Sequence, residues 1–323
     1  MQLTKGSARK VKAEKVQIAR LETHTSEEYF ALLNKIRAAG CVVYGVKTLR
    51  AGPHYAIDTN YDPTKTFMII VKPKSSAHWY TRDGISAHTI TGANGAERST
   101  TLRDARKLNL LPSVTSVLGV LAKPGLEAWK QEQAILAALT LPRNHGESDD
   151  TFAGRVVTDM QSQVEKAAGF GTAIHAAIEQ VNTAGNTDSV LPEVKPWLDC
   201  YNQWREGSIL RVLRSEETVI QAGYAGRFDL LADHAEHGIC LVDFKTQNVK
   251  KDKPNFYEAW GYQLAAYRHA LGMNCHCLSL VIDSNKPAAP VEKLWADDEL
   301  DNGLEIFKAA LEIWQRQRGY IPV

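Results

Sequence analysis

Residues 224–246 have the sequence Tyr-Ala-Gly-Arg-Phe-Asp-Leu-Leu-Ala-Asp-His-Ala-Glu-His-Gly-Ile-Cys-Leu-Val-Asp-Phe-Lys-Thr, which has the pattern of a β-hairpin. Residues 227–232 form a short apolar-rich run, and residues 239–244 form a second run rich in β-branched and aromatic side chains. The polar residues 234–238 between them end in glycine, as a turn does. The pattern predicts two antiparallel strands joined by this turn.

Three charged side chains interrupt the two apolar runs: Asp229, Asp243 and Lys245. Strand side chains alternate between faces, so Asp243 and Lys245 project from one face while Phe244 points into a core. If the hairpin pairs around its turn, Asp229 lies close to Asp243 on the neighbouring strand. Ionised groups in such strands are costly to desolvate unless they are paired or bind a metal.

Two interpretations of this charge cluster are open. In the first, a buried Asp–Lys ion pair closes the hairpin and has only a structural role. Alternatively, the converging carboxylates hold a hard divalent cation such as Mg²⁺, which accepts oxygen ligands, and the lysine orients a water and offsets charge on a phosphate.

Five segments together resemble the PD-(D/E)XK nuclease superfamily, in its RecB-like, phage-type exonuclease branch. Gly226-Arg-Phe-Asp229 and Asp243-Phe-Lys245 resemble the core signature, and Gly171-Thr-Ala-Ile-His175 resembles a helical Gly-x-x-x-His motif. The remaining two are Gln263-Leu-Ala-Ala-Tyr267, similar to a Gln-x-x-x-Tyr motif, and Leu111-Pro-Ser-Val-Thr115, similar to a segment of phage exonucleases and of the mitochondrial genome maintenance exonuclease. The resemblance covers roughly residues 76–318, and Phe228 stands where the superfamily name has proline.

The resemblance implies roles for these residues. Asp229, Asp243 and the Phe244 backbone carbonyl would hold Mg²⁺ or Mn²⁺, with His175 completing the site. Lys245 would position the attacking water and steady the phosphate in the transition state. Further roles are expected for Gln263 and Tyr267, which would organise the lysine or the nucleic-acid backbone.

A supporting glutamate and a nucleic-acid interface are also expected. Relatives place a glutamate before the hairpin, and of the adjacent Glu216 and Glu217 we choose Glu217. Phosphate contacts are assigned to two hydroxyls and a lysine-rich stretch, namely Ser113, Thr115, Lys250, Lys251 and Lys253. Aromatic residues near the site, such as Trp260 and Tyr262, could stack on unpaired bases, although core packing explains either residue equally well.

From residue 163 onward, hydrophobic periodicity predicts helix, three strands, helix, strand and helix. The predicted ranges outside the hairpin are Gln163–Val181, Arg211–Gln221, Phe256–Leu271, Cys275–Asp283 and a last helix ending near Arg318, with a further helix at Pro192–Arg205. This order predicts an α/β fold whose mixed central sheet is flanked by helices, in agreement with the αβββαβ core that the resemblance implies. Residues 75–323 would form this nuclease domain, and residues 1–74 a small N-terminal α/β module of unknown role.

Composition excludes several other classes of protein. The formal net charge of the 323 residues is +1, so DNA binding requires a local basic patch. The five cysteines form no Cys-x-x-Cys pair or four-cysteine set, which argues against a zinc ribbon or an iron–sulfur cluster. No phosphate-binding Gly-x-x-x-x-Gly-Lys-[Ser/Thr] motif is present, so ATP use is not expected.

The sequence therefore predicts a metal-dependent DNA exonuclease of phage or bacterial recombination, repair or replication. A structure-specific endonuclease on the same fold and a non-catalytic DNA-binding recombination protein are the alternatives. Expected partners are DNA, as single strands or duplex ends, and a single-strand annealing or single-strand binding protein. No apolar run approaches the ~18 residues of a membrane span, and no signal-peptide core is evident, so a cytoplasmic protein of a bacterium or an infected host cell is expected.

Overall fold

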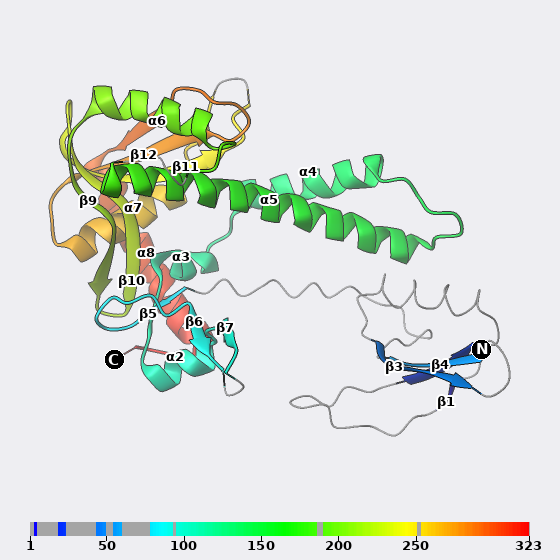
Figure 1. Cartoon of the computed structure of the whole chain (residues 1–323). Coiled ribbons are helices and arrows are strands. Elements are labelled where there is room, and N and C mark those ends of the chain that lie inside the picture. The colour runs from blue at the N-terminus through cyan, green and yellow to red at the C-terminus, as the bar shows by residue number, and fades with distance from the viewer. Residues whose placement is uncertain are drawn as a thin grey trace. The chain divides into compact units, whose positions relative to one another are not determined.

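The computed structural model describes residues 78–92, 95–185, 190–250 and 253–322, together with the backbone of four strands nearer the N-terminus (Figure 1). These are β1 (Leu3–Thr4), β2 (Ala19–Thr23), β3 (Val43–Leu49) and β4 (His54–Thr59), which form an antiparallel sheet in the order β1-β2-β4-β3. The chain divides into two compact units, one of Met1–Pro73 with Gly125–Val164 and one of Lys74–Pro124 with Glu165–Val323.

The first unit also contains α4 (Pro124–Thr140) from Gly125 onward and the first half of α5 (Asp149–Ala184). The helix predicted from Gln163 therefore begins fourteen residues earlier, since residues 149–162 continue it without a glycine or proline break except Gly154. The second half of α5 belongs to the second unit and carries His175.

A five-stranded mixed sheet in the order β13-β12-β11-β10-β9 forms the centre of the second unit. Its strands are β9 (Ile209–Gln221), β10 (Tyr224–His234), β11 (Gly238–Gln247), β12 (His276–Asp283) and β13 (Val291–Trp295). Only β11 and β12 pair in parallel, and the other pairs are antiparallel. The predicted mixed central sheet flanked by helices is confirmed, and β13 is an edge strand that the sequence pattern did not predict.

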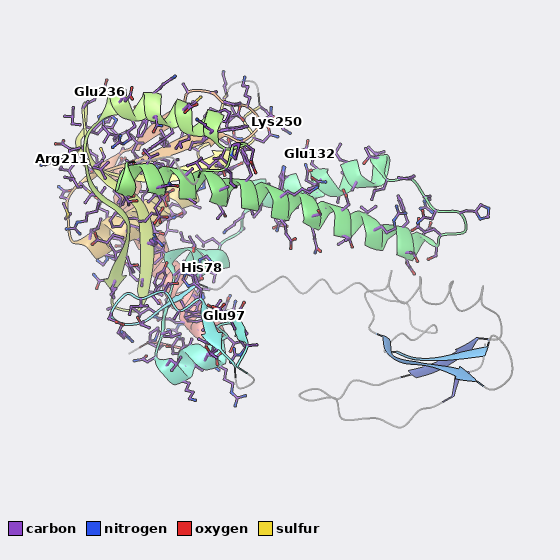
Figure 2. All side chains as sticks on the ribbon, in the orientation of Figure 1. His78, Glu97, Glu132, Arg211, Glu236 and Lys250 are labelled. Carbon is purple, nitrogen blue, oxygen red and sulfur yellow. The ribbon has the colours of Figure 1, made fainter. Side chains whose placement is uncertain are left out.

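Helices cover both faces of this sheet (Figures 1 and 2). On one face, the second half of α5 and α6 (Lys195–Ser208) bury residues such as Ile174 and Tyr201 against Phe244 and its neighbours. On the other face, α7 (Glu258–Leu271), α8 (Asp297–Arg318) and α3 (Val114–Val117) pack against Phe228 and Leu241. The alternation of the β11 side chains thus feeds two separate cores.

Smaller elements complete the second unit. They are β5 (Trp79–Tyr80) paired with β8 (Leu111–Pro112), β6 (Thr89–Thr91) paired with β7 (Glu97–Ser99), α2 (Leu102–Leu108) and a 3-10 turn at Leu118–Val120. None of the helices in the described part of the chain combines the length and apolar character needed to cross a membrane.

The feature that positions the site is a fork between β10 and β11. The two strands pair from the turn, at His234 and Gly238, as far as Leu230 and Val242. Beyond that point β10 stays paired with β9, while β11 stays paired with β12 as far as Gln247. The strands therefore separate at the residues that follow Val242 and precede Leu230, and backbone groups at the fork need other partners.

Candidate active site

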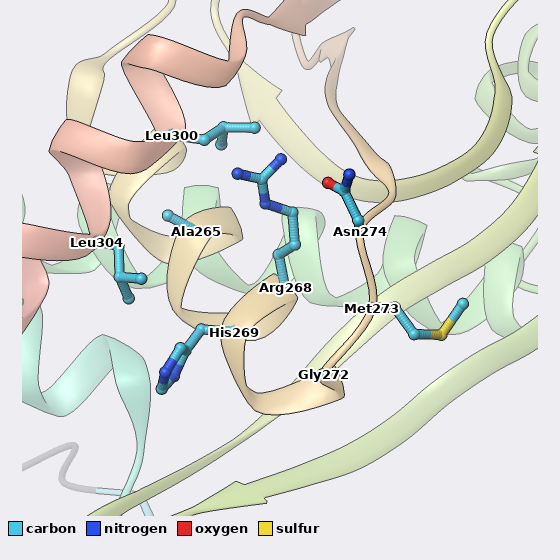
Figure 3. A pocket seen from close by; sticks show the side chains of 8 residues that line it. All are labelled: Ala265, Arg268, His269, Gly272, Met273, Asn274, Leu300 and Leu304. Atoms are coloured by element: carbon cyan, nitrogen blue, oxygen red, sulfur yellow. The ribbon is translucent and has the colours of Figure 1, made fainter.

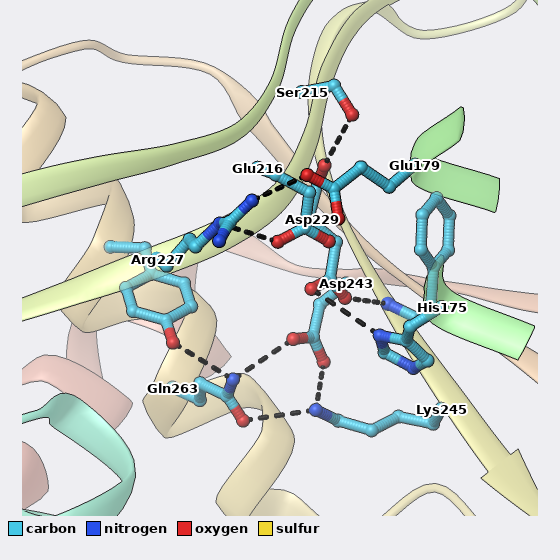
Figure 4. A network of polar contacts seen from close by, with 11 residues as sticks. His175, Glu179, Ser215, Glu216, Arg227, Asp229, Asp243, Lys245 and Gln263 are labelled. Carbon is cyan, nitrogen blue, oxygen red and sulfur yellow. Dashed lines mark hydrogen bonds and ion pairs between the residues drawn. The ribbon is translucent and has the colours of Figure 1, made fainter. Parts of the chain in front are cut away.

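Both aspartates of the hairpin lie at the fork (Figure 4). Asp243 is 2% exposed, and Asp229 Oδ2 accepts a hydrogen bond of 2.6 Å from the Phe244 backbone N–H. Because the β10–β11 ladder has ended, the Asp229 carboxylate takes the place of a strand partner for this amide. The backbone of Phe244 is thereby fixed beside the carboxylates.

A chain of polar contacts runs from Asp243 to helix α7. The Lys245 ammonium lies 2.6 Å from Asp243 Oδ2 and donates to Gln263 Oε1 at 3.1 Å. Gln263 Nε2 donates to Asp243 Oδ1 at 3.0 Å and to the Tyr267 hydroxyl at 3.2 Å. The structure therefore brings together the Asp-x-Lys pair and the predicted Gln-x-x-x-Tyr pair. Gln263 forms hydrogen bonds with both Lys245 and Asp243 and so holds them together.

Two glycines allow the helices and strands around these polar contacts to pack closely on one another. A Cβ at Gly226 would overlap the Tyr267 ring, so the absence of a side chain on β10 lets Tyr267 lie over the strand. A Cβ at Gly171 on α5 would lie 2.6 Å from Thr246 Oγ1, closer than packing allows. Helix α5 therefore packs closely on the end of β11, and His175 follows one turn later.

His175 reaches the aspartates from the opposite side of the sheet to α7. Its Nδ1 lies 3.7 Å from Asp229 Oδ1, and its ring packs edge-on against Phe244 at 5.9 Å between centroids. Burial, and then the nearby Lys245 charge, lower the pKa of His175 below its usual value. The ring is therefore poised as a neutral nitrogen donor, the form that binds metals.

Glu216, rather than the predicted Glu217, is the glutamate at the site. Glu216 has a positive φ of 53° and lies opposite Asp229, between the paired positions Glu217–Phe228 and Ser215–Leu230. One oxygen of each of Glu216 and Asp229 and one nitrogen of His175 lie within 4.8 Å of one another. The side chain of Glu217, the predicted residue, is 49% exposed and contacts Arg214 at 3.2 Å, so the structure does not bring it together with the aspartates.

Arg227, which lies between Gly226 and Phe228 on β10, connects Glu216 to helix α5. Arg227 Nε lies 2.8 Å from Glu216 Oε2, and Arg227 Nη2 donates to Glu179 Oε1 at 2.6 Å. Glu179 lies one helical turn after His175. Arg227 therefore holds two carboxylates in place next to the aspartates, where their mutual repulsion would otherwise separate them.

The carboxylates are crowded enough to resist ionisation. Burial is the main cause that raises the pKa of Asp229 and of Asp243 to about 6 each, although the Lys245 charge opposes the shift. Burial, followed by the charge of Asp229, raises the pKa of Glu216 to about 8. Each group would ionise more readily if a further cation were close.

The donor set fits a hard divalent cation. When ionised, the four carboxylates of Glu179, Glu216, Asp229 and Asp243 exceed the charges of Arg227 and Lys245 by two, the charge of one such ion. Carboxylate oxygens with one imidazole nitrogen are ligands suited to Mg²⁺ and Mn²⁺. His175, Glu216 and Asp229 are the side chains that together could hold the ion. Of the predicted ligands, Asp243 instead has Oδ2 in contact with Lys245 and Oδ1 in contact with Gln263.

The residues predicted to contact phosphate are less tightly grouped. Ser113 is 3% exposed and accepts the Ser116 backbone N–H at 3.0 Å, so its hydroxyl caps the four-residue helix α3. Thr115 is exposed and lies 3.0 Å from the Ser113 hydroxyl. Ser113 also bridges Ala225 on β10, which places this segment beside the strand that carries Arg227 and Asp229.

Lys250 and Lys253 are exposed, and their backbones form an isolated β-bridge in the loop between β11 and α7 (Figure 2 labels Lys250). Lys251 lies outside the described residues. The two aromatic residues that were candidates for base stacking lie in different places. Trp260 lies beside Lys245, whereas the Tyr262 hydroxyl donates to Glu258 and its ring packs near Gly303 of α8.

A pocket lies between α7 and α8 (Figure 3). Its volume is about 290 Å³, and its residues include Arg268, His269 and Met273. Arg268 is already paired with Asp297 at 2.7 Å and with Asp301 at 3.2 Å. This cavity holds no group of ionisable side chains comparable to the cluster at the fork.

Comparisons with known proteins leave the family of this chain open. No protein-family model matches the sequence, and no curated protein matches it. Among solved structures, the crystal structure of SSO0001 is similar with a TM-score of 0.24 and 13% identity over 47% of this chain and 68% of that chain. An alkaline exonuclease from Laribacter hongkongensis is similar with a TM-score of 0.23 and 16% identity, over 60% of this chain and 98% of that one. Likenesses with such low scores say nothing about activity, which has to be inferred from the chain's own side chains.

Proposed function

We propose that this protein is a divalent-metal-dependent deoxyribonuclease that hydrolyses phosphodiester bonds, acting as an exonuclease. The observation that carries the proposal is the buried cluster at the β10–β11 fork, in which Asp229, Asp243 and Lys245 meet. A structural ion pair would need only one carboxylate for one lysine. Here Glu216 and His175 add donors on the same site, leaving an excess of negative charge that suits a cation.

The chain's own residues would divide the work of hydrolysis. A Mg²⁺ or Mn²⁺ ion at this site would supply positive charge to the scissile phosphate and lower the pKa of a water molecule. Lys245 would hold the attacking water and offset the charge that develops on a phosphate oxygen. Gln263 would keep Lys245 in place through its contacts with Asp243 and Tyr267. The water oxygen attacks phosphorus as the P–O bond to the leaving nucleotide breaks, so the products are one phosphate monoester and one hydroxyl end.

The DNA backbone would be held outside this cluster. Lys250 and Lys253 provide exposed positive charge in the loop after β11, and Thr115 is exposed in the segment beside β10. Phosphate contacts of this kind position the strand without reading its sequence.

Lys245→Ala tests the catalytic proposal directly. End-labelled linear single- and double-stranded DNA and a closed circle would be incubated with Mg²⁺, Mn²⁺ or EDTA. The variant should lose roughly 10²-fold in cleavage rate, because it lacks the cation that faces the developing charge. Lys308→Ala removes an exposed lysine of α8 that contacts Glu305 and serves as the matched control, with unchanged activity expected.

The same experiment separates the rival functions. Metal-dependent loss of the linear substrates alone supports an exonuclease, and the position of the lost label gives its polarity. Nicking of the closed circle would instead identify an endonuclease. DNA binding without cleavage under either metal would contradict the catalytic proposal and leave a binding protein.

Glu216→Gln and Glu217→Gln form a matched pair on adjacent residues. Glu216→Gln should weaken Mn²⁺ binding at least roughly tenfold, because it removes a charge and a ligand from the cluster. Glu217→Gln should leave Mn²⁺ binding within about twofold, since an exposed pair with Arg214 contributes little. Isothermal titration of Mn²⁺ measures both, and equal effects in the two variants would contradict the assignment of Glu216.

A further inference from the structure

Three aromatic side chains meet where the loop after β11 enters helix α7. Tyr257 packs edge-on against Trp260 at 5.1 Å between centroids, and Phe256 does so at 6.3 Å. Tyr257 is 40% exposed, while Phe256 and Trp260 are partly buried. These three residues are called the aromatic corner below.

The aromatic corner is attached to the candidate active site. The Lys245 ammonium lies 6.0 Å from the centre of the Trp260 ring, a distance typical of a cation–π contact. The Gln247 side chain, two residues after Lys245, donates to the Asn255 carbonyl at 3.2 Å and accepts the Asn255 N–H at 2.8 Å. The residue before Phe256 is therefore tied to the end of β11, which fixes the aromatic corner next to Lys245.

Core packing accounts for only part of this arrangement. Trp260 contacts the core beneath α7, but Tyr257 caps the helix without a side-chain hydrogen bond to it and presents much of its ring to solvent. Tyr262 on the same helix differs, because it is held by Glu258 at 2.9 Å and packs near α8. The exposed Tyr257 ring is linked to Lys245 through Trp260, which contacts both, and the exposed Lys253 lies in the preceding loop.

We infer that the aromatic corner stacks an unpaired nucleobase beside the phosphate held at Lys245, so that the protein prefers single-stranded or frayed DNA to a fully paired duplex. This inference rests on the proposed function and names its substrate class. Aromatic rings stack on any base, and lysines that flank them contact the backbone. Inside a duplex both faces of each base are covered by its neighbours, so away from the ends a protein ring reaches only bases that have left the stack.

The test is DNA binding measured in EDTA, where a metal-dependent nuclease does not cleave. Fluorescence anisotropy at fixed salt would compare a single-stranded oligonucleotide with a long blunt duplex of two annealed strands, for wild type, Tyr257→Ala and Tyr257→Phe. Wild type should bind the single strand more tightly. Tyr257→Ala should weaken single-strand binding about tenfold and leave duplex binding unchanged, whereas Tyr257→Phe, which keeps the ring, should stay within about twofold of wild type.

Equal wild-type affinity for both DNAs, or an equal loss for both in Tyr257→Ala, would overturn the inference. The result is independent of the cleavage assay. A protein that cleaves DNA without a Tyr257-dependent preference loses this inference and keeps the proposed function. One with the preference but no cleavage loses the proposed function and keeps the base-stacking site.

Discussion

Asp229→Asn is expected to reduce metal-dependent DNA cleavage by roughly 10³-fold, because a lost ligand forfeits several kcal/mol of charge stabilisation at about 1.4 kcal/mol per tenfold. The same change should stabilise the metal-free protein. Asparagine keeps an oxygen that can accept the Phe244 N–H, but it removes a charge whose burial raises the pKa of Asp229 to about 6. One pKa unit corresponds to about 1.4 kcal/mol, so a gain of about 1–3 kcal/mol in the free energy of unfolding is expected near pH 8.

Chemical denaturation in EDTA measures this gain, beside the cleavage rate in Mg²⁺. The gain should vanish near pH 4, since the folded protein then already holds Asp229 protonated and no charge is buried. Glu217→Gln provides a control in which neither quantity changes. A variant that is destabilised near pH 8 would contradict the view that burying the ionised Asp229 carboxylate destabilises the metal-free protein.

Mn²⁺ or Mg²⁺ should raise the melting temperature of the wild-type protein strongly near pH 8 and hardly at all near pH 5. The pKa values of Asp229, Asp243 and Glu216 are all raised in the folded state, to about 6, 6 and 8. These three groups therefore bind more protons in the folded protein than in the unfolded chain, and their contribution to metal-free stability falls as pH rises from about 4 to 8. Metal and protons compete for the same oxygens, so stabilisation by metal grows over the same range.

A shift of about 5 °C at saturating metal is expected near pH 8, from the size of ligand-linked stabilisation and the scaling of melting temperature with chain length. Differential scanning fluorimetry over a pH series with and without Mn²⁺ measures it. Asp229→Asn should flatten the dependence. A shift that is equal at all pH values, or that persists in Asp229→Asn, would place the metal elsewhere.

Features that depend only on local geometry were predictable from the amino-acid sequence. Alternation along a strand puts Asp243 and Lys245 on one face, and the four-residue spacing of Gln263 and Tyr267 puts both on one side of a helix. The mixed sheet with helices on both faces follows in the same way, because period and length of each apolar run specify its element.

Which side chains distant in the sequence come into contact depends on the tertiary structure. The choice between Glu216 and Glu217 depends on the register between β9 and β10. Glu216, with its positive φ, lies opposite Asp229, whereas Glu217 pairs with Phe228 and has a side chain that is 49% exposed. Two adjacent glutamates carry no local signal of such a register. Ser113 is likewise used as a buried helix cap, because the bridge to Ala225 encloses it.

The fork between β10 and β11 is the clearest case of this kind. Its position depends on where pairing with β9 and β12 pulls the two strands apart, and those strands are distant in the sequence. Only there does the Phe244 amide lose its partner on β10 and donate to Asp229, which fixes the Asp229 carboxylate at the fork. Side-chain period is a property of a segment, whereas strand separation is a property of the whole sheet.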